Sequence, residues 1–123
     1  MIKRLFILFL LTSCYNVDRN CENFKIGEFE FTYKLNDTIQ RSLFTRTLDY
    51  EIEEFNSLID SSSISWVNDC EFILTKLNPN TNQEKRPVRI KIIRTYENSY
   101  DFEYSSVNEP IIIKRGTVTK IKN

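Results

Sequence analysis

The sequence contains no histidine and only two glycines. It therefore lacks the usual general base of neutral-pH catalysis and the commonest metal ligand in proteins. It also has no Gly-x-Ser-x-Gly motif, no glycine-rich loop to cradle a phosphate and no cysteine–histidine pair. These absences argue against an enzyme, and we predict no catalytic residue, no bound metal and no cofactor.

Neither sign of charge is in excess, because 17 basic residues face 17 acidic ones. Two of the basic residues, Lys3 and Arg4, belong to an N-terminal leader described below. The remaining chain is slightly acidic, so nothing in it would attract nucleic acid. Its length suits a single domain. Its lysines and arginines stand singly among other residues, as they do on a solvated surface.

One cluster of carboxylates stands out, formed by Glu51, Glu53 and Glu54. Two carboxylates on one strand face could carry out acid–base chemistry or bind calcium. No second acidic cluster and no glycine-marked calcium loop accompanies them. The pattern therefore favours a solvated strand face.

The N-terminus has the features of a secretory signal that is cut at a cysteine. Lys3 and Arg4 precede an apolar run over residues 5–11, which is too short for the ~20 residues that span a bilayer. Leu11-Thr12-Ser13-Cys14 then resembles the lipobox of bacterial lipoproteins. The resemblance implies cleavage before Cys14 and acylation of that cysteine with palmitate-like chains. Several such chains are needed for a stable hold on a membrane.

This reading divides the chain into a signal peptide (1–13), a lipidated tether (14–23) and one domain (24–123). Plain secretion and an uncleaved N-terminal anchor are the alternatives. No acidic cluster follows Cys14. We therefore expect a lipid-anchored protein of the outer membrane, on its periplasmic face.

Two further cysteines remain, Cys21 and Cys70. The bacterial envelope is oxidising outside the inner membrane, so a disulfide between them is the leading interpretation. Two free thiols are the alternative. Two cysteines are also too few for an all-protein tetrahedral zinc site.

Alternation of apolar and polar residues with a period of two runs through the domain and predicts strands. Asn36-Asp37 indicates a turn, and the longest loop begins at Asn78. Residues 48–59 fit a strand but also a short amphipathic helix, and we expect the segment to end at residues 60–63. Residues 111–121 predict a last strand or pair of strands broken at Gly116. Seven or eight short strands in sequence predict an all-β fold. We expect an antiparallel up-and-down meander that closes into a small calycin- or lipocalin-like barrel, with a β-sandwich as the alternative.

A barrel of eight strands is just wide enough to be filled by side chains or to hold one small ligand. Both outcomes stay open for the large apolar residues expected to face inward, for which core packing is the default. The candidates for lining a cavity are Phe31, Trp66, Phe72, Ile90 and Phe102. Separately, Asp37-Thr38-Ile39 resembles the short O-glycosylation signal of Bacteroidetes, which would place a sugar on Thr38.

Several segments together resemble a group of short flavobacterial lipoproteins. They are CENFKIGEF (21–29), FTRT (44–47), ISWVNDCEF (64–72) and GTV (116–118). The resemblance covers most of the mature chain, and its two cysteines stand at both anchor points, which fits their pairing. Some members of the group carry a topoisomerase IV label, which nothing in this short, exported, slightly acidic chain supports.

We therefore expect a non-enzymatic lipoprotein of the cell envelope that works by binding. Its partners would be the membrane, through the lipid, and either a small apolar ligand or an envelope protein. A structural or assembly accessory with a solid core and no ligand is the alternative.

Overall fold

The computed structural model describes residues 19–123, and the predicted signal peptide and Cys14 lie outside this range. The chain begins with a short 3₁₀ turn, η1 (Cys21–Phe24). Eight strands follow, in order β1 (Gly27–Leu35), β2 (Thr38–Arg46), β3 (Tyr50–Phe55), β4 (Leu58–Asn68), β5 (Glu71–Lys76), β6 (Val88–Thr95), β7 (Ser99–Ser106) and β8 (Glu109–Lys122). No helix among these residues is both long and apolar enough to cross a membrane.

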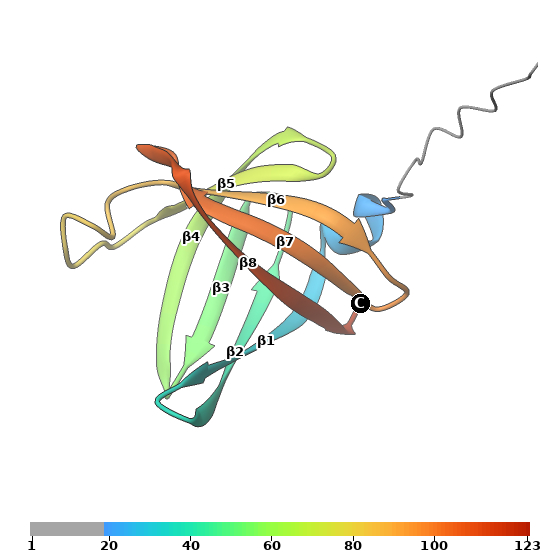
Figure 1. The fold of residues 1–123 in the computed structure, drawn as a ribbon, viewed down its shortest axis with the longest axis horizontal. Coiled ribbons are helices and arrows are strands. Elements are labelled where there is room, and N and C mark those ends of the chain that lie inside the picture. Colours follow the sequence, from blue (N-terminus) through green and yellow to red (C-terminus); the bar gives the residue numbers. More distant parts are fainter. Residues whose placement is uncertain (1–18) are drawn as a thin grey trace, which may run out of the picture.

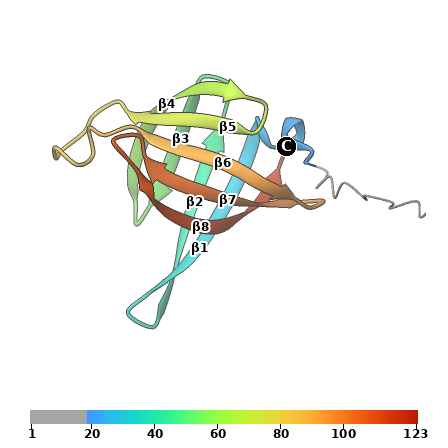
Figure 2. The ribbon, with the colours of Figure 1, turned by 45° about the horizontal axis from the view of Figure 1, so that its top comes forward.

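The eight strands form a closed antiparallel up-and-down barrel, which confirms the predicted fold class (Figures 1 and 2). Each strand pairs with the next along the chain, and β1 pairs with β8 to close the circle, for example at Phe31 and Val118. The sandwich alternative was wrong. Closure pairs both edges of the sheet, so no edge strand is left open.

Three local expectations need correction. Residues 50–55 form strand β3, so the helical alternative for residues 48–59 was wrong. The polar run at residues 60–63 does not end a segment, because β4 continues through it to Asn68. β8 likewise runs unbroken through Gly116. The turn at Asn36-Asp37 is as predicted, and both residues adopt the left-handed backbone that such a hairpin turn needs.

The barrel has a packed end and a mouth. The packed end receives η1 and contains most of the buried apolar residues, among them Phe24, Phe29, Ile92 and Tyr100. The mouth is surrounded by the β1–β2, β3–β4 and β7–β8 turns and by the long loop between β5 and β6 (Figure 1). The five most exposed aliphatic side chains all lie near those three turns: Ile39, Leu58, Ile59, Ile111 and Ile112.

Candidate functional site

The barrel contains an open cavity between the packed end and the mouth, made of two adjoining parts. Its inner part has a volume of about 130 Å³ and has mainly aromatic and aliphatic walls. An outer part of about 180 Å³ lies towards the mouth, and most of the residues that line it are polar or charged. Glu51, Glu53 and Leu74 line both parts, so the two adjoin. The inner walls are completed by Phe31, Ser42, Phe44, Arg46, Phe72, Ile90, Tyr100, Phe102 and Val118.

Arg46 forms the floor of this cavity and is one of the most buried residues, at 2% exposure. Its guanidinium donates hydrogen bonds to the Phe24 carbonyl (2.7 Å), to the Tyr100 hydroxyl (2.8 Å) and to the Glu51 carboxylate (3.2 Å). Four aromatic rings surround it, with centroids 4.7–5.8 Å from its central carbon. A buried charge is tolerated only when it is paired and hydrogen-bonded, and Arg46 meets both conditions.

Glu51 is the ion-pair partner of Arg46, and its side chain is only 11% exposed. Burial raises the pKa of Glu51, while the charge and hydrogen bond of Arg46 partly oppose that rise. Burial likewise raises the pKa of Tyr100, so its hydroxyl stays neutral and accepts the bond from Arg46. This arrangement corrects the expectation that Glu51 lies on a solvated strand face. Register explains the difference, because β2 and β3 pair Arg46 with Glu51.

Glu53 lies two residues further along β3 and faces the same side as Glu51. Its carboxylate accepts a 2.7 Å hydrogen bond from the hydroxyl of Ser42, which is buried. Glu53 itself is exposed where the inner part of the cavity meets the outer part. Within residues 19–123, no cationic side chain lies within ion-pair distance of it.

The outer part of the cavity is bordered by a network of charges that ties the β5–β6 loop to the barrel. Lys76 forms ion pairs with Asp60 (2.7 Å) and with Glu84 of the loop (3.4 Å). Glu84 also accepts a 2.7 Å bond from the backbone N–H of Asn80. That bond and Lys76 hold the pKa of Glu84 below its ordinary value. Asp60 and Ser62 of the polar run of β4 line this outer part of the cavity, so the run can continue as a strand without burying polar side chains in the apolar core.

Four of the five residues proposed from the sequence as cavity lining do line the inner part: Phe31, Phe72, Ile90 and Phe102. Gly116 lies against two of them. A methyl group added there would come within 2.9 Å of both the Phe31 and the Phe102 rings. The glycine therefore lets these rings pack where they do.

Trp66 does not line the cavity. Its ring packs on Phe72 with centroids 4.7 Å apart, and its indole N–H donates to the Leu48 carbonyl (3.1 Å). The ammonium of Lys25 lies 5.1 Å above the indole. Trp66 therefore packs against other side chains at the packed end, which is the default expectation for a lone tryptophan.

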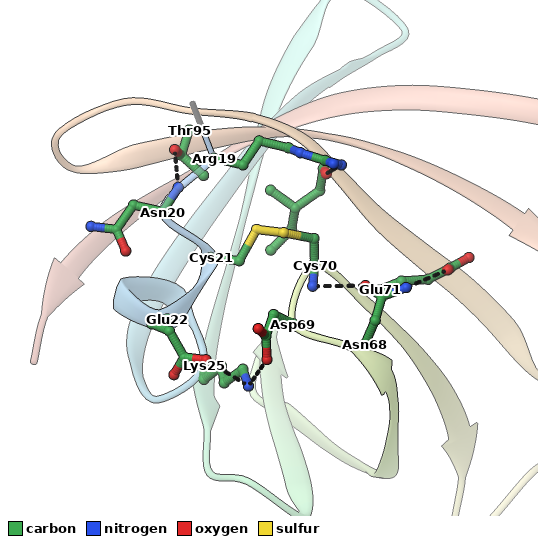
Figure 3. Close-up of a disulfide and its surroundings, with 11 residues drawn as sticks. Arg19, Asn20, Cys21, Glu22, Lys25, Asn68, Asp69, Cys70, Glu71 and Thr95 are labelled. Atoms are coloured by element: carbon green, nitrogen blue, oxygen red, sulfur yellow. Dashed lines mark hydrogen bonds and ion pairs between the residues drawn. A yellow bond between two sulfur atoms is a disulfide. The ribbon is translucent and has the colours of Figure 1, made fainter. Parts of the chain in front are cut away.

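The packed end is held together by the disulfide between Cys21 and Cys70, which join η1 to the β4–β5 turn (Figure 3). Lys25 reinforces the same junction through ion pairs with Glu22 (3.1 Å) and Asp69 (3.0 Å). The backbone N–H of Asn20 donates to the Thr95 hydroxyl at 2.8 Å, on the β6–β7 side. These contacts fix the entering chain against the end opposite the mouth.

Thr38 is exposed at the start of β2, next to the tight turn, so a sugar on it would meet no steric barrier there. Its glycosylation stays a prediction. Among the residues that the structure describes, no group of histidine, cysteine or carboxylate side chains is placed to hold a metal ion.

Sequence reasoning missed the polar residues of the interior, namely Ser42, Arg46, Glu51, Glu53 and Tyr100 in its bond to Arg46. A signal for two of them was present, since Ser42 and Arg46 alternate in step with Phe44 and so share its face. Searches against protein-family models, curated proteins and solved structures returned no match for the chain. The case for a function therefore rests on the cavity and its charges.

Proposed function

We propose that this chain is a non-enzymatic binding protein of the cell envelope that takes up a small molecule inside its barrel. The observation that carries the proposal is the adjoining inner and outer parts of the cavity, the inner with mainly aromatic and aliphatic walls and the outer lined mainly by polar residues. Binding sites for small molecules usually combine apolar walls with a few convergent polar groups, as this interior does.

The size of the cavity limits the ligand. Its two parts together amount to roughly 300 Å³, at the small end of the range for ligand sites. A cavity of about 150 Å³ can hold a benzene molecule. The inner part, at about 130 Å³, therefore suits one small ring or a short branched chain. A long-chain lipid is too large for this interior.

The proposed location rests on the N-terminal sequence, and the disulfide supports it. We propose that Cys14 carries the lipid anchor and that the domain stands on the periplasmic face of the outer membrane. A disulfide between Cys21 and Cys70 suits that oxidising compartment. Replacing Cys14 with alanine should abolish incorporation of a fatty-acid probe in growing cells. Continued labelling of the variant would contradict the anchor.

Native mass spectrometry of the protein isolated gently from its own envelope tests the binding role. We expect an added mass of a few hundred daltons or less, lost on mild activation. Leu74→Trp, which fills the cavity where its two parts meet, should abolish the added mass. Ile73→Trp makes a similar change on the outer face of β5 and should retain it. A bare mass for the wild type, with an added neutral one-ring compound such as toluene also unbound, would favour the structural accessory instead.

A further inference from the structure

A purely apolar ligand would need no charged side chains around it, yet several charged side chains line this cavity. Some of them form ion pairs within the protein and one does not. Seven charged side chains line its two parts: Arg46, Glu51, Glu53, Asp60, Lys76, Glu84 and Arg86. Three are cations and four are carboxylates, so the lining has one negative charge in excess.

Each of the three cations already has a protein partner. Arg46 pairs with Glu51 in the interior. Lys76 pairs with both Asp60 and Glu84 at the mouth. Arg86 pairs with a residue outside the cavity lining, Glu109 of β8, at 3.1 Å.

In the described part of the chain, Glu53 is the one carboxylate of this lining that forms no ion pair, and its place in the barrel is specific. It is directly opposite Phe44 on β2 and Asp60 on β4, so it stands between the aromatic inner part and the polar outer part. The buried hydroxyl of Ser42 donates to one of its oxygens, which holds the carboxylate beside β2. Among the described residues no cation pairs with Glu53, so a cationic ligand could reach it without displacing a protein partner.

The charges that line the cavity also argue against an anionic ligand. Among residues 19–123, Arg46 is the one cation that lines the inner part, and three of its five N–H donors are bonded to Glu51, Tyr100 and the Phe24 carbonyl. An incoming carboxylate or phosphate would compete with Glu51 for Arg46 and would lie close to the unpaired charge of Glu53. Like charges brought together in a partly desolvated site repel strongly.

We propose, as a refinement of the binding role above, that the ligand is a small organic cation with a compact apolar or aromatic body and one protonated amine. The body occupies the inner part, between Phe31, Phe72 and Phe102. The ammonium donates to Glu53 at the junction of the two parts. Because Glu53 is partly in contact with water, the gain from this ion pair is modest, about tenfold in affinity.

Three compounds with the same body test the charge preference: 3-phenylpropylamine, 3-phenylpropanol and 3-phenylpropionate. Isothermal titration calorimetry of the protein with the disulfide intact should rank the amine about tenfold tighter than the alcohol and the acid weakest. Glu53→Gln should lower the affinity for the amine to that for the alcohol, and the affinity for the alcohol should not change. Glu54→Gln is the matched control, because it deletes the same charge on the outer face of β3, beside Leu43 and Ile59. It should leave the ranking as in the wild type.

The outcomes separate this inference from the proposed function. Equal binding of amine and alcohol, or a preference for the acid, would overturn the cationic ligand while leaving a binding cavity in place. An equal loss of amine affinity in Glu53→Gln and Glu54→Gln would show only a general charge effect and would also overturn it. If none of the three compounds binds and Leu74→Trp changes nothing, the binding role itself fails with the inference.

Discussion

Replacing Arg46 with methionine should lower the free energy of unfolding by about 3–5 kcal/mol, the usual cost of breaking a buried ion pair from one side. The change leaves the Glu51 carboxylate, at 11% side-chain exposure, without its counter-charge. It also leaves the Phe24 carbonyl and the Tyr100 hydroxyl without a donor that now lies 2.7–2.8 Å away. Each buried hydrogen bond lost in this way costs about 1–3 kcal/mol of stability. The predicted loss in free energy of unfolding given above already includes part of this cost, so the two do not add in full.

Urea unfolding followed by tryptophan fluorescence, with the disulfide intact, measures the loss. The matched control is Arg41→Met, on the outer face of the same strand. Arg41 is 58% exposed and pairs with Glu30 at 2.9 Å, so its loss should cost less than about 1 kcal/mol. If Arg46→Met folds too weakly to measure, the double variant Arg46→Met/Glu51→Leu remains informative. It removes both charges, so it should be clearly more stable than the single variant.

The pH dependence gives a second, independent check on the same reasoning. Burial raises the pKa of Glu51, and Arg46 partly opposes that rise. Without Arg46 the pKa should rise further. A carboxyl whose pKa is higher in the folded than in the unfolded protein destabilises the fold above both values, and the penalty disappears as pH falls through the folded pKa. The free energy of unfolding of Arg46→Met should therefore fall further below that of the wild type at about pH 8 than at about pH 5. Three results would refute the argument. They are a loss of unfolding free energy that does not change with pH, a loss under about 1 kcal/mol, and a double variant that is no more stable than the single one.

Three further outcomes follow from the described contacts. Removing the disulfide with Cys21→Ser/Cys70→Ser, whose partners are 49 residues apart, should cost about 4 kcal/mol in urea unfolding; an unchanged midpoint would contradict a stabilising link. Gly116→Ala should cost about 1–3 kcal/mol in thermal unfolding, because the added methyl meets two aromatic rings at 2.9 Å; a stabilised variant would show that the rings yield freely. Glu84→Gln should reduce the hydrogen-exchange protection of the Asn80 amide at neutral pH. In the wild type the same loss should occur only in acid, as pH falls through the lowered pKa of Glu84, and equal protection in both proteins at neutral pH would refute this.

The architecture followed from the sequence because each strand has a period of two and pairs with its neighbour along the chain. Closure of the barrel by pairing of β1 with β8 was the feature that the local sequence indicated least. It depends on pairs such as Phe31 with Val118, which are far apart in the sequence, and no local pattern specifies them. The length of β4 was also missed, because a run of serines beside an aspartate favours a turn locally. Its neighbours in the barrel, Tyr50 opposite Ser63 for one, keep it extended.

The interior charges were assigned to the wrong side for a different reason. Alternation separates the two faces of a strand but does not say which face points inward. In β3 the apolar face points outward, where Tyr50 is 51% and Ile52 48% exposed, and the glutamates point inward. The Arg46–Glu51 pair is what makes this arrangement possible. Predicting it requires the β2–β3 register, which brings those two side chains together.

The entry of the chain at the packed end has a consequence for how the barrel would face a membrane. Cys14 is seven residues before Cys21, so even a fully extended connection reaches only about 25 Å. If Cys14 carries the predicted acyl chains, the disulfide-bonded pole of the barrel is held close to the bilayer and the opposite pole is turned towards water (Figure 2). A guest molecule would then arrive and depart through the aqueous compartment, by diffusion or by handover from a soluble donor, without first dissolving in the membrane.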